Sequence, residues 1–304
     1  TADNNTAVGK DALTANTTGT GNTAIGSLSL DGNTTASYNT AIGNEAMGNN
    51  VDGSRNTAVG YAALFTMDPD SATDTHNTAV GFESLKLNTT GTQNTALGSG
   101  ALDANTTASS GTAVGYNSLG ANTTGVANVG LGQNSLASNT TASDNTALGS
   151  HSLDTNTTGA SNTGVGRNAL RANTTASNNT AVGKDSLLAN TTGTQNTSVG
   201  GSSLDANTTG NYNTAVGFGS LSANTTASES TAVGAGALQA NTTGANNTAV
   251  GRLALGANTT GVQQVAFGSE ALDANTEGNY NAAFGHGALG SNTTASNNTG
   301  IGTY

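Results

Sequence analysis

A 17-residue spacing runs through the whole sequence and limits its possible folds more than any other feature. If the Asn of the recurrent Asn-Thr-Ala-Val-Gly is taken as position 1, then 18 repeats begin between Asn5 and Asn298. Three repeats begin with another residue, namely Gly111, Ser230 and Gln264. One spacing, from Asn56 to Asn77, is 21 residues instead of 17. A fixed period predicts one array of stacked coils rather than separate globular domains.

The short period and the residue types together favour strands over helices. A repeated pair of helices needs roughly 33 residues or more, and Gly, Asn and Thr are poor helix formers. We expect two short strands per coil, near positions 1–4 and 9–13, joined by Gly and Asn turns. The predicted fold is an all-β, parallel β-solenoid of about 18 tandem coils. It spans residues 1–304 as a single domain, with a four-residue insertion within 65–76.

Two positions of the repeat are apolar in every coil and are expected to form the interior. Position 4 is always a large apolar residue, and position 9 is Leu with Met47 as the one variant. Stacked coils would turn these positions into two continuous columns. The predicted core residues are Val8, Leu13, Ile25, Leu30, Val80, Leu85, Val114, Leu119, Val182 and Leu187. Strand alternation would then point positions 10, 12 and 14 outward and position 2 inward.

Three further positions accept only small residues. Position 5 is Gly in all 18 repeats, which predicts a positive φ or too little room for a Cβ atom. The first of these turn glycines are Gly9, Gly26, Gly43, Gly60 and Gly81. Position 3 is always Ala, Gly or Ser, and position 8 is Ala or Ser. Because position 3 should point away from position 4, we expect it to pack on other copies in a homotrimer. The candidate interface residues are Ala7, Ala24, Ala41 and Ala58.

Composition argues against several classes of function. The chain has 7 basic and 18 acidic residues, too few cations for a patch that binds nucleic acid. It has no apolar run long enough to cross a bilayer, so no membrane insertion is expected in this segment. It also has no cysteine, and its three histidines, His76, His151 and His286, are far apart. We therefore expect no catalytic residues, no metal site and no cofactor, and the chain is not predicted to be an enzyme.

The insertion is the main irregularity in the array and admits two interpretations. It contains the single Pro and three aspartates, Asp68, Asp70 and Asp74. Carboxylates could hold a hard cation such as calcium or contact a ligand. Alternatively, the insertion is a surface loop of little consequence, because added loop length costs little free energy.

Two recurrent residue types also suggest surface chemistry. Asn-Thr-Thr at Asn16, Asn33, Asn88 and Asn105 matches the N-glycosylation sequon, although a column of turn asparagines explains it as well. Aromatic residues recur at positions 6 and 17 and could stack on sugars, or could be ordinary exposed side chains. They are Tyr61, Phe82, Tyr116 and Phe218 at position 6, and Tyr38, Tyr212 and Tyr280 at position 17.

The repeat Asn-Thr-Ala-Val/Ile-Gly-x-x-Ala/Ser-Leu resembles the head repeat of trimeric autotransporter adhesins. The 17-residue form, with Ala-Leu-x-Ala-Asn-Thr-Thr-Gly after it, is similar to arrays in bacterial surface proteins and phage tail fibres. The resemblance covers nearly the whole chain and implies a homotrimeric, extracellular, adhesive protein at a cell or virion surface. The adhesin-head repeat is usually about three residues shorter.

The sequence thus predicts a non-enzymatic structural or adhesive fibre segment whose partners are further copies of itself, with a surface glycan or receptor as a possible ligand. One alternative is a subunit of a self-assembling extracellular filament. Another is a protein that binds ice or a crystal lattice through the outward Thr of position 14.

Overall fold

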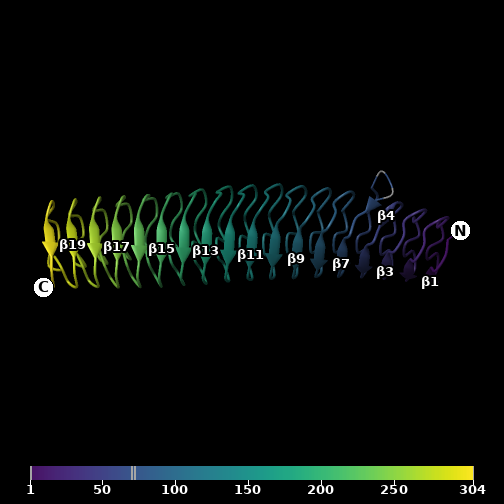
Figure 1. Ribbon diagram of the computed structural model, residues 1–304, viewed down its shortest axis with the longest axis horizontal. Helices are drawn as coiled ribbons and strands as arrows, with labels where there is room; N and C mark the ends of the chain where they lie inside the picture. The colour runs from purple at the N-terminus through teal and green to yellow at the C-terminus, as the bar shows by residue number, and fades with distance from the viewer. Residues whose placement is uncertain (1, 70, 72, 304) are drawn as a thin grey trace. The chain divides into compact units, whose positions relative to one another are not determined.

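The computed structural model shows an all-β, parallel β-solenoid whose coils repeat about every 17 residues, which confirms the predicted fold class. It describes residues 2–69, 71 and 73–303. The chain divides into two compact units, Thr1–His151 and Ser152–Tyr304. In each unit the strand arrows lie on the same side of successive coils (Figure 1). The described residues include no helix.

One three-residue strand in each coil, at positions 2–4, carries the Thr-Ala-Val segment. In the first unit these strands are β1 Thr6–Val8, β2 Thr23–Ile25, β3 Thr40–Ile42, β5 Thr57–Val59, β7 Thr78–Val80, β8 Thr95–Leu97, β9 Thr112–Val114, β10 Val129–Leu131 and β11 Thr146–Leu148. In the second unit they are β12 Thr163–Val165, β13 Thr180–Val182, β14 Thr197–Val199, β15 Thr214–Val216, β16 Thr231–Val233, β17 Thr248–Val250, β18 Val265–Phe267, β19 Ala282–Phe284 and β20 Thr299–Ile301.

Neighbouring strands pair in parallel with every residue opposite its counterpart in the next repeat. Thr180 lies opposite Thr197 and Val182 opposite Val199, for example. The 21-residue spacing does not disturb this pairing, since Thr57 still lies opposite Thr78. The four extra residues fall beside two short additional strands, β4 Gly53–Ser54 and β6 Thr73–Asp74, which pair with each other.

The prediction of a second strand near positions 9–13 is wrong. Leu at position 9 has a left-handed backbone conformation, with φ +52° at Leu187 and +52° at Leu204, and a strand residue cannot adopt it. This segment still bonds to the next coil, because Leu187 N–H donates to Ser203 O at 3.0 Å and Ala189 N–H to Asp205 O at 2.9 Å. The coils are therefore linked along both sides, although only one side is a regular sheet.

The interior differs from the prediction in one of its two columns. Leu30, Leu85, Leu119 and Leu187 are fully buried and Leu13 is partly buried, so position 9 lies inside as expected. Position 4 does not. The predicted core residues Val8 and Ile25 are 58% and 39% exposed. Val80, Val114 and Val182 are only partly buried, on the same outward face of the sheet.

The residue that points inward from the strand is the small one at position 3. Ala24, Ala41 and Ala58 are completely buried within the single chain, so they are core residues and not the interface predicted for them. Ala7, in the first coil, is exposed. Because the coil interior is already filled by Leu and Asn side chains, only a small residue such as Ala, Gly or Ser fits beneath the strand.

Positions 3 and 8 are small because they face each other inside the coil. Ser198 at position 3 shares a 2.8 Å hydrogen bond with Ser186 at position 8 of the preceding coil. At Gly130, a Cβ atom would lie 2.5 Å from Ser118 Oγ, closer than any real contact. The absence of charge at these positions therefore reflects burial within one chain and does not indicate a homotrimer.

Two buried columns of asparagine complete the interior. Position-1 asparagines accept the N–H of the next position 1 on Oδ1, as Asn179 does from Asn196 at 2.9 Å. Position-12 asparagines donate to the preceding asparagine, as Asn190 does to Asn173 Oδ1 at 3.1 Å. Both columns also donate to the carbonyl of position 15, so Gly193 O accepts from Asn179 and Asn190 at 2.9 Å each. The expected outward direction of position 12 is wrong.

The turn glycines at position 5 have the positive φ that was predicted. Gly9, Gly26, Gly43, Gly60 and Gly81 have φ between +135° and +140°. A Cβ atom on Gly26 would lie 2.4 Å from the carbonyl oxygen of Gly43 in the next coil. Both the conformation and the close approach of two backbones therefore require glycine here.

Candidate functional surfaces

The outward side of the parallel sheet is a continuous, uncharged surface in each unit. We call it the Thr/Val face and define it as the side chains of positions 2 and 4 in strands β1 to β11 and, separately, β12 to β20. Position 2 is Thr apart from Val129, Val265 and Ala282, and position 4 is always Val, Ile, Leu or Phe. Position 2 was expected to point inward, but its side chains lie on this exposed or partly exposed side.

The Thr/Val face is unusual for its kind of sheet. Parallel sheets are normally covered on both sides, whereas here the inner side packs on Leu and Asn and the outer side is open. Val199 and Val233 are 37% and 36% exposed, and Phe267 and Phe284 stack on neighbouring strands with ring centroids 6.2 Å apart. An apolar surface of this length is typical of an interaction site.

The aromatic residues lie beyond the two ends of the strand. Tyr61 and Phe82 at position 6 stack, with ring centroids 5.2 Å apart and an interplanar angle of 18°. At position 17, the guanidinium of Arg55 lies 5.0 Å above the ring of Tyr38. Tyr116, Tyr212, Phe218 and Tyr280 are all exposed.

The aspartates of the insertion do not form a cation site among the residues described. Asp74 is paired with Arg55, whose Nε lies 2.8 Å from its Oδ2. Asp68 is exposed, and its backbone N–H donates to Thr89 O at 3.1 Å. Asp70 lies outside the described residues. Within the described part of the chain, no group of three or more His, Cys, Asp or Glu side chains is placed to hold a metal ion.

The insertion has an interior role that the sequence did not reveal. Met67 replaces the position-12 Asn of its coil and is completely buried. Its sulfur accepts from Asn88 Nδ2 at 3.2 Å. Because Met has no N–H to donate, Asn50 Oδ1, in the coil before, is buried without a hydrogen-bond partner. This break is the local disturbance that accompanies the 21-residue spacing.

Apart from the partly buried Asn16 and Asn292, the asparagines of the Asn-Thr-Thr sequons are buried and are wrongly placed for glycosylation of the folded chain. Asn33, Asn88 and Asn105 are completely buried, and each donates its side-chain amide to the carbonyl three residues later. A glycan on Nδ2 would remove these hydrogen bonds and would not fit in the interior. The asparagine column is the interpretation that the structure supports.

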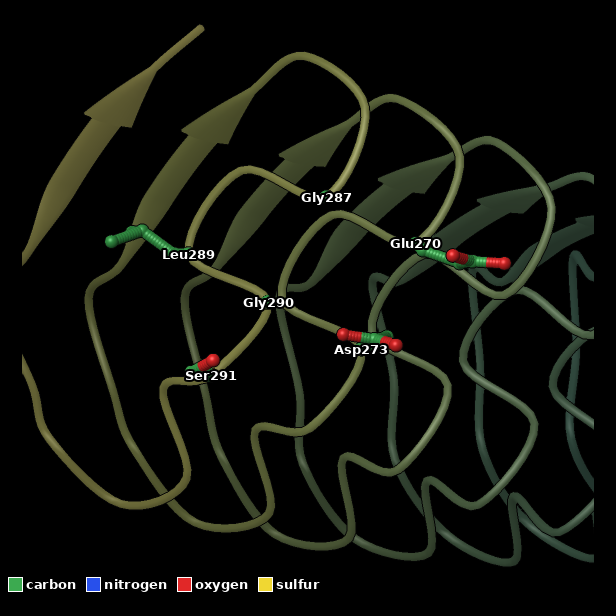
Figure 2. Close-up of a pocket in the computed structure, with 6 residues that line it drawn as sticks. All are labelled: Glu270, Asp273, Gly287, Leu289, Gly290 and Ser291. Atoms are coloured by element: carbon green, nitrogen blue, oxygen red, sulfur yellow. The ribbon is translucent and has the colours of Figure 1, made fainter. Parts of the chain in front are cut away.

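Hollows form beside glycines of positions 7 and 10. One hollow of about 440 Å³ lies beside Gly287 and Gly290, which leave the side chains of Glu270 and Asp273 open on the preceding coil (Figure 2). Glu270 is paired with Arg252. A second hollow of about 200 Å³ lies beside Gly219 and Gly236, between Phe218 and Arg252.

Several aspartates at position 10 are partly buried. Burial raises the pKa of Asp31, Asp103 and Asp205, since removal from water disfavours the charged carboxylate. One carboxylate oxygen of Asp103 and one of Asp205 are buried without a hydrogen-bond partner.

Among the residues described, no helix is long and apolar enough to cross a membrane. His76 and His286 are exposed and His151 is partly buried.

A scan of the sequence against protein-family models found no match, and a search of curated proteins found none either.

Proposed function

We propose that this chain is a structural and adhesive segment of an extracellular fibre, in which copies of the chain associate through their Thr/Val faces as a homotrimer. The observation that carries the proposal is the exposed outer side of the parallel sheet. Half of the outward strand residues, those of position 4, are Val, Ile, Leu or Phe, and burying them against another copy removes apolar area from water.

The partner that best fits the Thr/Val face is another copy of the same chain. Side chains on this face repeat with the strand spacing, ~4.8 Å, and a second copy repeats with the same spacing. The side chains of the two surfaces can therefore interdigitate in the same register along their whole length. A standard specific interface buries roughly 800 Å² per partner, and the nine stacked strands of one unit offer a long surface for one.

The distribution of charge also favours association through the Thr/Val face. The formal net charge is −11, so copies repel one another over most of their surface. The Thr/Val face carries no charged side chain in any repeat. Association through it therefore keeps the acidic side chains in water. The extracellular placement is supported by the resemblance of the repeat to adhesin heads and tail fibres.

The proposal is tested by measuring the mass of the native protein in solution at micromolar concentration. We expect three times the 29.4 kDa of one chain. The variant Val199→Lys/Val233→Lys places two charges on the Thr/Val face and should yield monomers. Its matched control, Thr209→Lys/Thr243→Lys, places the same charges at the exposed position 14 of the same two coils and should stay trimeric.

A monomeric wild-type protein would contradict association through this face. Long, heterogeneous assemblies would contradict a closed trimer and favour the extracellular filament instead. Circular dichroism of both variants checks that the fold is intact, which is expected because all four substituted side chains contact water.

A second candidate function is supported by the exposed threonines of position 14. Thr192, Thr209, Thr226, Thr243 and Thr260 are all exposed in successive coils of the second unit. A row of hydroxyl and methyl groups at the strand spacing could bind ice or another lattice. Growth of ice crystals at an unchanged rate and shape in the presence of the protein would remove this candidate.

A further inference from the structure

A small hollow in the second unit combines an exposed aromatic ring with polar groups. Its lining residues are Phe218, Gly219, Ala235, Gly236, Gln239, Arg252 and Leu253, and its volume is about 200 Å³. All of them occupy positions 6, 7 and 10 of three successive coils. None belongs to positions 2 or 4, so the hollow lies outside the Thr/Val face.

The ring of Phe218 forms one wall of this hollow and lies beside a glycine of the preceding coil. Phe218 is 72% exposed, which is unusual for a phenylalanine in a well-packed chain. A Cβ atom on Gly201, at the same position of the preceding coil, would lie 3.5 Å from Phe218 Cδ2. The ring therefore extends over Gly201, and the hollow opens between it and Arg252, two coils further on.

The floor and the opposite wall supply complementary chemistry. Ala235 is small, and a Cβ atom on Gly219 would meet nothing within 4 Å, so the space there is open. Leu253 packs against Gly236 and adds an apolar surface. The side chain of Gln239 offers both a hydrogen-bond donor and an acceptor, and Arg252 offers several donors. Arg252 is paired with Glu270, so its charge is largely balanced.

We propose that this hollow binds one pyranose ring of a neutral glycan. The C–H groups on one side of a pyranose carry partial positive charge and pack on the negative face of an aromatic ring. Its hydroxyls both donate and accept hydrogen bonds, as Gln239 and Arg252 require. The balanced charge of Arg252 favours a neutral sugar over an anionic one. The volume lies below the range for drug-sized ligands, ~300–1,000 Å³, and suits a single ring.

This inference gives a ligand class to the adhesive role proposed above, but it depends on different residues. The association test changes Val199 and Val233, whereas the glycan test changes Phe218 and Ala235. A protein that associates but binds no sugar would contradict only the glycan site. One that binds sugar as a monomer would contradict only the association.

The test is saturation-transfer NMR and titration of the full chain with three probes: methyl β-D-glucopyranoside, methyl β-D-galactopyranoside and N-acetyl-D-glucosamine. We expect at least one to bind in the millimolar range. Phe218→Ala removes the stacking surface and Ala235→Leu fills the hollow, and each should weaken binding by about tenfold or more. Ala235 is exposed and has no positive φ, so the second variant should fold normally.

Tyr212→Ala is the matched control, because Tyr212 is an exposed aromatic residue of the same unit at position 17. It should leave binding unchanged. The proposal is overturned if none of the three sugars binds at millimolar concentration, or if Phe218→Ala and Ala235→Leu bind as tightly as the wild type. Binding of phenol without binding of any sugar would identify a plain apolar hollow and would also overturn it.

Discussion

Asn88 Nδ2 lies 3.2 Å from the sulfur of Met67, at a place where the neighbouring coils put an asparagine oxygen. The next asparagine on the other side, Asn50, keeps a buried oxygen without a donor. This single exchange interrupts a column that otherwise repeats, as between Asn105 and Asn88 at 2.7 Å. It removes one hydrogen bond from the column at the coil with the insertion.

Met67→Asn should therefore stabilise the first unit. It supplies a donor to Asn50 Oδ1 and an oxygen acceptor to Asn88, and satisfying one buried polar atom is worth about 1 kcal/mol or more. Amide hydrogen exchange at residues 50 and 88 should slow. Met47→Leu, a volume-conserving change in the leucine column, is the control and should change little. Faster exchange in Met67→Asn would contradict the role assigned to the broken column.

Removal of an intact asparagine should have the opposite effect. Asn190→Ala leaves Asn173 Oδ1 without its donor and Asn207 without the oxygen at 2.8 Å. We expect a loss of ~2–3 kcal/mol, because buried polar atoms without partners cost the full desolvation penalty. The denaturant midpoint measures it. Thr192→Ala, two residues away and exposed, should stay within about 0.5 kcal/mol of the wild type.

The glycines of position 5 can be tested against another glycine nearby. Gly183 has φ +135°, and its Cβ would lie 2.4 Å from Gly200 O, so Gly183→Ala should cost ~2–3 kcal/mol. Gly201 has no positive φ, and its Cβ would make an ordinary 3.5 Å contact with the ring of Phe218. Gly201→Ala should be close to neutral by thermal unfolding. Equal losses in the two variants would argue against backbone crowding as the cause.

The partly buried Asp205 should change how the stability of the fold depends on pH. Because burial raises the pKa of Asp205 above its usual 3.8, the folded chain binds its proton more tightly than the unfolded chain does. This carboxylate therefore destabilises the fold at neutral pH, and that effect fades as the pH falls through the raised pKa towards 3.8. Asp205→Asn should raise the denaturant midpoint at pH 7 relative to the wild type.

The advantage of Asp205→Asn should shrink on acidification, when the wild-type carboxyl is itself neutral. Asp144→Asn, at an exposed position, provides the control for the general effect of removing one negative charge. An equal gain in both variants at every pH would show that net charge, and not burial, is responsible.

The amino-acid sequence by itself determined the period, the parallel stacking and the position-9 column. Position 9 is Leu in nearly every coil, and an apolar side chain repeated in this way is expected in the interior. Leu85 and Leu187 are indeed buried there. The invariant glycine at position 5 likewise signalled a special backbone, and Gly183 has it. These features follow from local conformation and from repetition, which a single sequence displays.

Only the tertiary structure decided which side of the strand faces inward. Alternation places Ala181 and Val182 on opposite sides but does not say which side is inside, and hydrophobicity alone favoured the wrong choice. The interior is shared by Leu187 and the asparagines Asn179 and Asn190, so beneath the strand there is room for a methyl group but not for valine. Polar side chains fill a core when, as here, stacking gives each one a partner in the next coil.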